Sequence, residues 1–363
     1  MDPRVRRHAE ILVDHCTDVQ SGDMVQVVAS PPAEPLVEPL YAELGKRGAR
    51  PSLTWGSSRA SRAYALEMDP EDMVTKEHDL AAIGETDVVF FIGGGGNTKE
   101  SVDMPTDYRQ AAQRAHHPIL QERLEKRWVI TQYPTESAAQ QAEMSTAAYE
   151  EFVWSAVNRD WDAQREFQQQ MVNLLDPADE VHIVAGDETD ITLDVSGMTA
   201  LNDDGEMNMP GGEAFTVPHP DGVEGTVRFD MPVMFQGHEI EGAYLEFEGG
   251  RVVHHDADAN AEMLESVLEV DEGAKHLGEL GIGMNRGIDR FSYNMLFDEK
   301  MGDTIHLAVG DAIEECLPEG MEKNESATHL DMLVDMSEDS RIELDGEVVQ
   351  RDGTFVFEEG FEE

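Results

Sequence analysis

Apolar side chains in the first half of the chain alternate between the spacing of helices and that of buried strands. Residues 4–19 and 32–45 repeat apolar positions with helical periodicity, and the long segments 107–126 and 139–175 are mostly helical in pattern. Short apolar runs lie between them, and the predicted strands are Met24–Ala29, Arg50–Trp55, 87–92 and 128–132. Strands separated by helices predict a layered α/β domain with a mostly parallel sheet.

The pattern changes after residue 176. Short apolar segments with close turns now predominate, interrupted by one predicted helix over residues 257–268. The predicted strands are residues 181–185, 191–195, 226–231, 243–248, 304–309 and 329–334. We therefore predict two domains, an α/β N-terminal domain over residues 1–176 and a β-rich α+β C-terminal domain over residues 177–363.

Acidic residues greatly outnumber basic ones along the whole chain. There are 76 Asp and Glu against 26 Lys and Arg, a formal charge of -50, and only seven of the basic residues are Lys. The acids are interleaved with apolar runs and 40% of the residues are hydrophobic, which predicts a folded protein. Its self-repulsion is tolerable in molar salt, where the Debye length is about 3 Å, so we predict a halophilic protein. The charge excludes nucleic acid as a partner, because no basic face is left for phosphates.

Cysteine usage and hydropathy predict a cytoplasmic protein. The two cysteines, Cys16 and Cys316, lie far apart and form no CxxC motif, which is typical of reduced thiols in a reducing compartment. No apolar run approaches the ~18 residues that a membrane span needs, and the N-terminus has no long apolar segment of a secretory signal. We expect neither export nor a membrane partner.

A glycine run at residues 93–96 follows a predicted strand, where phosphate-binding loops also lie. It lacks the Lys-Ser/Thr pair of a P-loop and the spacing of a dinucleotide fingerprint. We interpret it as a flexible turn at the end of a strand, with a nucleotide-dependent enzyme as the alternative.

Histidines within predicted strands of the second domain carry more information, because carboxylates are common everywhere in this chain. His329 and Asp331 are two positions apart, so on a strand both side chains lie on one face, opposite Leu330 and Met332. His306 likewise lies opposite its apolar neighbours in the strand 304–309. A lone strand histidine is usually structural, but two such strands within 25 residues favour a binding site.

Two glutamates stand beside glycines in segments interpreted as ligand-presenting turns. Glu213 follows Pro-Gly-Gly just before a predicted strand, and Glu279 lies between Gly278 and Gly281. Glycines let backbones approach a shared centre closely. The alternative for either residue is that it lies in an ordinary acidic turn and binds no ligand. Together with the second-domain histidines and Asp331 they form a mixed N/O set, which suits two first-row divalent metals: Glu213, Glu279, His306, His329 and Asp331.

At these residues the sequence resembles the aminopeptidase T / aminopeptidase S / PepS family of metallopeptidases. The resemblance rests on ordered blocks: residues 208–218 (NMPGGEAFTVP), 271–279 (DEGAKHLGE), 296–300 with 305–310, and 324–331. Weaker similarity at 225–229, 242–253 and 36–49 extends it over nearly the whole chain. Several separate blocks in the same order are more specific than a single His-x-Asp motif.

The resemblance implies a metallo-aminopeptidase, a hydrolase of peptide substrates that acts as a homodimer with two divalent ions, Zn, Co or Mn. The five residues named above carry over as its metal ligands. The family's third block places a Tyr seven positions after its histidine, where this chain has Ile313; Tyr293 is the nearest alternative. We therefore expect Tyr293 to assist catalysis, and Glu279 to carry a proton from the water to the leaving amine.

Three alternatives remain open from the sequence. The first is a metal-binding relative whose catalysis is altered or lost, which Ile313 favours. The second is the nucleotide-dependent enzyme, and the third is a structural halophilic protein without a site.

Overall fold

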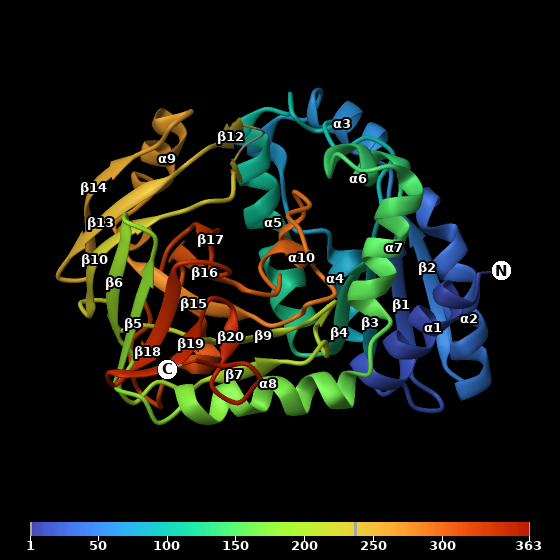
Figure 1. Cartoon of the computed structure of the whole chain (residues 1–363). Helices are drawn as coiled ribbons and strands as arrows, with labels where there is room; N and C mark the ends of the chain where they lie inside the picture. Colours follow the sequence, from blue (N-terminus) through green and yellow to red (C-terminus); the bar gives the residue numbers. More distant parts are fainter. Residues whose placement is uncertain (1, 236–237, 363) are drawn as a thin grey trace. The chain divides into compact units, whose positions relative to one another are not determined.

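A computed structural model describes residues 2–235 and 238–362 and divides the chain into two compact units (Figure 1). The first unit consists of Met1–Arg159 with Gly205–Gly211, and the second of Asp160–Asp204 with Gly212–Glu363. The second unit is therefore interrupted by a short segment that belongs to the first. Among the described residues no helix has the length and apolarity that crossing a membrane requires.

The first unit is built on a parallel five-stranded sheet with the order β2-β1-β3-β4-β8. Its strands are β1 (Met24–Ala29), β2 (Arg50–Trp55), β3 (Val88–Gly93), β4 (Arg127–Gln132) and β8 (Asn208–Met209). Its helices are α1 (Pro3–Ile11), α2 (Glu34–Arg47), α3 (Ser58–Ala65), α4 (Glu77–Gly84), α5 (Thr106–Leu124), α6 (Glu136–Gln141) and α7 (Thr146–Val157). Consecutive buried residues Val88, Val89 and Phe90 in the central strand β3 are typical of a parallel sheet covered on both faces. This confirms the predicted α/β architecture.

Two features of the first half of the chain and its sheet differ from the prediction. The mostly helical segment 139–175 is three helices, because turns at residues 142–145 and 158–160 interrupt it. The two-residue strand β8 comes from the Asn208–Met209 segment and pairs with β4 through Ile130 and Thr131. A strand this short has no period to recognise in the sequence.

The glycine run after β3 forms a turn. Gly94 has φ +131°, and a Cβ atom there would lie 2.9 Å from the carbonyl oxygen of Tyr133, so only glycine fits. The Gly94 carbonyl oxygen accepts a hydrogen bond from the Ser30 hydroxyl at 2.8 Å.

The second unit contains two antiparallel sheets (Figure 1). The eight-stranded sheet has the order β14-β13-β10-β6-β5-β18-β19-β20. Its strands are β5 (Glu180–Ala185), β6 (Thr189–Asp194), β10 (Val223–Arg228), β13 (Tyr244–Glu248), β14 (Arg251–Asp256), β18 (Ser340–Leu344), β19 (Glu347–Arg351) and β20 (Thr354–Phe355). Strands β11 (Val233–Phe235) and β12 (His238–Ile240) form a separate pair, and the predicted helix 257–268 is the shorter α9 (Ala261–Leu268).

The five-stranded sheet, with the order β17-β16-β15-β9-β7, carries the candidate site. Its strands are β7 (Leu201–Asp203), β9 (Glu213–Thr216), β15 (Leu277–Gly283), β16 (Thr304–Gly310) and β17 (His329–Asp335). One face contributes Ile305, Leu307 and Val309 to a hydrophobic core that also includes Val181 and Ile183 of the eight-stranded sheet. The opposite face is therefore left for His306 and the other polar side chains, as the strand alternation predicted.

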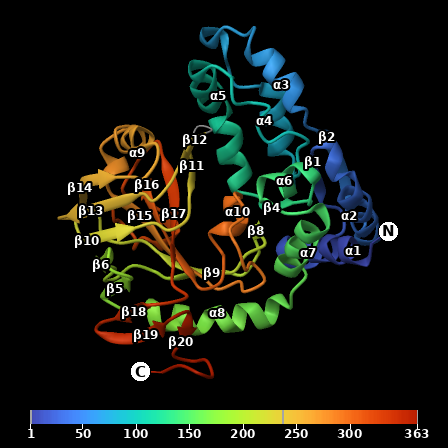
Figure 2. The ribbon, with the colours of Figure 1, turned by 45° about the horizontal axis from the view of Figure 1, so that its top comes forward.

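Helix α8 (Trp161–Leu175) belongs to the second unit, where it lies against β7 and β9. Figure 2 shows α8 below β9. Its residues Met171, Val172 and Leu175 are part of the second unit's core. The compact units thus divide at Arg159/Asp160, one helix before the boundary placed at residue 177. The composition changes only after α8, because an amphipathic helix has the same pattern whichever core it covers.

A buried histidine in the first unit predicts a pH-dependent stability. His8 on α1 is fully buried, its Nε2 lies 2.8 Å from the Thr131 hydroxyl, and its ring packs edge-on to Trp154. The Thr131 hydroxyl donates to the Met209 carbonyl oxygen, so it accepts a hydrogen bond from Nε2 of His8. Burial lowers the pKa of His8 to about 3. A second proton would reach Nδ1, which is buried and has no hydrogen-bond partner within the described ranges.

We predict that His8→Gln reduces the loss of unfolding free energy that the protein shows as pH falls below 7. Between the ordinary histidine pKa of about 6.5 and the folded value of about 3, the unfolded chain binds more protons than the folded one. Stability contributed by His8 is therefore present above pH 6.5 and is lost as pH falls, by about 1.4 kcal/mol per pH unit. Urea unfolding in molar KCl from pH 7 to pH 5 should show a steeper loss for the wild type than for the variant. Parallel profiles would contradict this prediction.

Candidate metal centre

The structure brings all five predicted ligand residues together on one face of the five-stranded sheet. The strand register places Glu279 opposite Ala308, Ala308 opposite Asp331, and Gly310 opposite His329. Gly283 on β15 pairs with Glu213 at the start of β9. Adjacent strands hold these side chains on a rigid scaffold, which favours a precisely arranged site.

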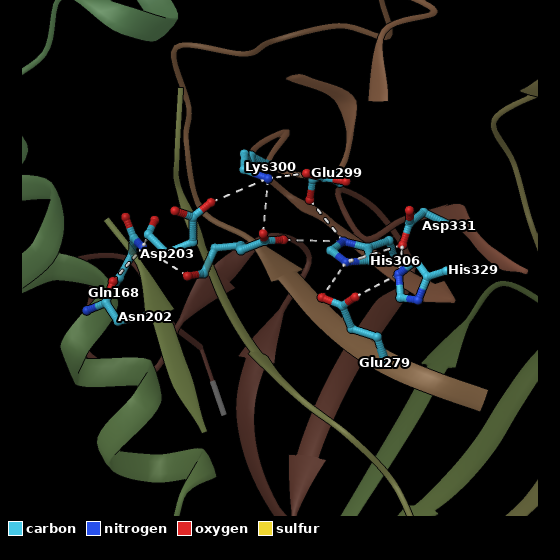
Figure 3. A network of polar contacts seen from close by, with 10 residues as sticks. Gln168, Asn202, Asp203, Glu279, Glu299, Lys300, His306, His329 and Asp331 are labelled. Carbon is cyan, nitrogen blue, oxygen red and sulfur yellow. Dashed lines mark hydrogen bonds and ion pairs between the residues drawn. The ribbon is translucent and has the colours of Figure 1, made fainter. Parts of the chain in front are cut away.

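Glu279 lies at the centre of the cluster. Its Oε1 is 3.3 Å from Nε2 of His306, and its Oε2 is 3.1 Å from Nε2 of His329. Figure 3 shows both histidines pointing toward this carboxylate. Oδ1 of Asp331 is 3.3 Å from Nε2 of His329, and Oε2 of Glu213 is 3.6 Å from Nδ1 of His306.

The ligand atoms form two groups of three, each with all of its atoms within 4.8 Å of one another. Glu213, Glu279 and His306 make one group, and all three are buried. Glu279, His329 and Asp331 make the other, which is more exposed at His329. Glu279 is shared by both groups.

Backbone carbonyls fix the tautomer of both histidines. Nδ1 of His306 lies 3.0 Å from the Glu299 carbonyl oxygen, and Nδ1 of His329 lies 2.8 Å from that of Asp311. Because a carbonyl oxygen only accepts, each Nδ1 carries a hydrogen and each Nε2 faces the carboxylates. A carbonyl on the far nitrogen is the usual support of a metal-binding imidazole.

The pKa values in the cluster follow from the crowding of opposite charges. Burial alone would raise the pKa of Glu279, but hydrogen bonds from the two histidines lower it to about 2. Burial alone would lower the histidine values, but the carboxylates raise the pKa of His306 to about 10 and that of His329 to about 12. The negative potential that holds these protons also attracts a divalent cation, which competes with them for the same lone pairs.

Glu213 provides an independent test of whether a cation fits. Burial raises its pKa to about 8, although Lys300 acts in the opposite direction. Its Oε2 is buried and has no hydrogen-bond partner within the described residues. A buried carboxylate oxygen without a hydrogen-bond partner is costly, so the Oε2 atom of Glu213 fits a metal ligand.

One prediction about this region was wrong. The segment around Glu279 is not a turn but the central strand β15, in which all seven residues are buried. Gly281 leaves space for a ligand side chain, and the backbone does not turn there. A Cβ atom at Gly281 would lie 2.0 Å from Cε1 of His306, which stands opposite it in the register. The sequence shows the glycines, but not that a neighbouring imidazole fills the space they leave.

Tyr293 lies in a loop held by the buried carboxylate of Asp298. Asp298 accepts hydrogen bonds from the backbone nitrogens of Ser292 and Asn294, and Tyr293 between them has φ +58°. The Tyr293 hydroxyl donates to Oε1 of Glu239 at 2.9 Å. Ile313 packs against the small apolar cluster that contains Ala312 and Cys316. The catalytic role of Tyr293 stays a prediction.

A buried lysine beside the ligands was not predicted from the sequence. Lys300 has no exposed surface, and its Nζ lies 3.1 Å from Oε1 of Glu213 and 3.4 Å from Oδ2 of Asp203. It also pairs with Glu299. Burial alone would lower its pKa, but the facing carboxylates raise it well above the ordinary value. Lys300 follows Asp298 and Glu299 in the sequence, so nothing local to the chain distinguishes it from an exposed ion pair.

Comparison with known proteins identifies the family. A family model described as thermophilic metalloprotease (M29) matches residues 1–361. The chain belongs to the M29 peptidase family. The resemblance found in the sequence blocks is thereby confirmed, and this M29 peptidase is a metallo-aminopeptidase, a hydrolase.

The match to M29 relatives extends over nearly the whole chain. Aminopeptidase AmpS of Bacillus subtilis (strain 168) is 27% identical over 413 aligned residues, covering 98% of each chain. The solved structure of wild-type AmpT from Thermus thermophilus superposes with a TM-score of 0.87, at 24% identity, and covers 98% of this M29 peptidase and 99% of that chain.

The fold alone does not determine the reaction. The structure of 2,5-dihydroxypyridine dioxygenase from Pseudomonas putida KT2440 also superposes, with a TM-score of 0.62 at 16% identity over 98% of this M29 peptidase and 97% of that chain. Because a protein named as a dioxygenase has a similar fold, the function of this chain must be inferred from the residues of its site.

Proposed function

We propose that the chain removes the N-terminal residue from short peptides with two divalent ions, Zn, Co or Mn, held by Glu213, Glu279, His306, His329 and Asp331. The observation that carries this proposal is the orientation of Glu279, which offers one oxygen to each histidine. A carboxylate in this arrangement is suited to binding two ions at once. When bound, such ions polarise a peptide carbonyl and lower the pKa of a water molecule.

The protein's own groups then have distinct tasks. The carbonyls behind His306 and His329 hold the rings so that each Nε2 lone pair faces the centre. The carboxylates around the site, including the partly buried Glu299, favour a positively charged group nearby, and the free α-ammonium of a peptide is such a group. This preference supports cleavage at the N-terminal residue. Proton transfer by Glu279 and assistance by Tyr293 stay predictions.

A second candidate is a metal-binding relative with altered or absent turnover. The observation that favours it is Ile313, an apolar side chain packed where the resembled family has a tyrosine. Two ions bound without hydrolysis of any aminoacyl substrate would support this candidate over the peptidase. Adaptation to molar salt, a cytoplasmic location and a homodimer also belong to the proposal, the last from the family resemblance alone.

Metal removal tests the proposed function. We expect hydrolysis of leucyl-p-nitroanilide and of a short leucyl peptide in molar KCl to fall to background after chelation. Addition of Zn, Co or Mn should restore release of the N-terminal leucine, because the five side chains provide the N/O ligands that these ions accept.

The matched control compares two histidines on strands of the same unit. His329→Ala removes a ligand and should stay inactive after metal is restored. His254→Ala, at an exposed position on β14, should respond to chelation and restoration as the wild type does. Undiminished turnover of the chelated wild-type protein would refute metal-dependent hydrolysis.

A further inference from the structure

Lys300 is an unusual residue to find without exposed surface. A lysine is almost never fully buried unless it is paired, and here one ammonium faces three carboxylates: Asp203, Glu213 and Glu299. Figure 3 shows Lys300 with Asp203 on one side and Glu299 on the other. This network adjoins the Glu213–His306 group, since Glu213 belongs to both.

The backbone around Glu213 explains why a cation is needed there. Asp203 on β7 and Glu213 on β9 are direct partners in the antiparallel register, and like charges opposite each other destabilise a sheet. The Gln168 side-chain amide donates to the carbonyl oxygens of both residues at 2.9 Å, which holds the two strands together at this point. Lys300 supplies the positive charge that lies between the two carboxylates.

The two oxygens of Glu213 have different surroundings. Oε1 is 3.1 Å from the Lys300 ammonium, whereas Oε2 is buried, has no hydrogen-bond partner in the described ranges, and lies 3.6 Å from Nδ1 of His306. Lys300 therefore holds the carboxylate by one oxygen and leaves the other directed at the ligand group. The second group has a different arrangement, because Glu279 and Asp331 are both paired with histidine.

We propose that Lys300 is a positioning residue that fixes Glu213 as a one-oxygen metal ligand and thereby sets the affinity of the Glu213–Glu279–His306 position, but not that of the Glu279–His329–Asp331 position. This inference rests on the proposed function, since it requires that both positions bind an ion. It predicts two binding steps that respond differently to a change at Lys300.

The experiment is a calorimetric titration of the chelated full-length protein with Co²⁺ in molar KCl, together with visible absorption of the bound Co²⁺. For the wild type we expect two ions per chain. For Lys300→Met we expect one step to weaken by about 10-fold to 100-fold, the usual effect of removing a group that orients a ligand. The other step should keep its affinity.

Loss of a buried positive charge can also unfold the protein, so a charge-balanced variant is included. Asp203→Asn/Lys300→Met removes one charge of each sign and should show the same selective loss. Asp203→Asn alone keeps the contact between Lys300 and Glu213, so a selective loss as large as that of Lys300→Met would assign the effect to the charge of the network and overturn the role of that contact. Lys46→Met removes a lysine charge at the surface of the first unit and serves as the remote control.

The outcomes separate this inference from the proposed function. Fewer than two ions on the wild-type protein would overturn the two-ion proposal itself. Two ions on the wild type with unchanged affinities in both Lys300→Met variants would overturn the role of Lys300 alone. Equal weakening of both steps would also overturn it, since the network would then support the whole site without positioning Glu213.

Discussion

Replacement of Glu279 by glutamine is expected to lower kcat/KM on a leucyl substrate by about 1000-fold and to remove both metal ions. Glutamine has nearly the same shape, but its amide nitrogen has no lone pair for a cation, and Glu279 is the one carboxylate shared by the two ligand groups. Loss of several kcal/mol of Lewis-acid stabilisation corresponds to a change of this size, at about 1.4 kcal/mol per factor of ten. Metal content by mass spectrometry and steady-state kinetics measure the two effects.

A second variant distinguishes the loss of the shared ligand Glu279 from the loss of a ligand that belongs to one group. Asp331→Asn alters only the Glu279–His329–Asp331 group and should retain one ion per chain. Glu248→Gln, at an exposed position on β13, is the matched control and should retain both ions and full activity. A Glu279→Gln protein that still binds two ions would show that the carboxylate is not the shared ligand.

Transfer from molar KCl to about 0.1 M KCl is expected to lower the melting temperature by more than about 10 °C. The 26 basic residues can neutralise only part of the 76 acidic ones, which leaves the formal charge of -50 to repel itself. The Debye length grows from about 3 Å to about 10 Å over this range, so neighbouring surface carboxylates are no longer screened. A loss of about 4 kcal/mol gives such a shift, at about 2–4 °C per kcal/mol for a protein of this size.

Thermal unfolding followed by circular dichroism at several concentrations of KCl measures this dependence. Tetramethylammonium chloride at equal ionic strength tests for screening, whereas sucrose tests for the stabilisation that excluded solutes provide without screening. A melting temperature independent of KCl between 0.1 and 2 M would contradict the predicted adaptation to salt.

Strand periodicity was sufficient to place several site residues on the correct face of the sheet. In β16 and β17 the apolar residues alternate with His306, His329 and Asp331, and the period of two fixes their directions without knowledge of the tertiary structure. The alternating helices and strands of the first unit were predictable for the same reason. These features depend on neighbours along the chain.

Features that depend on neighbours across the fold were not predictable. In β15 the glycines beside Glu279 indicate a turn when read alone, but the segment is a strand, and Gly281 lies opposite His306 of the adjacent strand. Lys300 follows Glu299 in an acidic chain, so an exposed ion pair is the natural interpretation of the sequence. Its burial depends on Asp203, which is 97 positions away and reaches it only through the pairing of β7 with β9.

The interrupted second unit has a consequence for how this chain can be divided. The Gly212 backbone nitrogen donates to the Asp203 carbonyl oxygen at 2.8 Å, so the two cut ends of the second unit already meet as the closing pair of a hairpin. The intervening residues form the loop of this hairpin. They include the short strand β8, which pairs with β4 in the parallel sheet of the first unit. A tight turn in place of residues 204–211 would make residues 160–363 a continuous chain carrying every candidate ligand. Cutting at residue 177 would instead discard α8 and leave β7 and β9 without their covering helix.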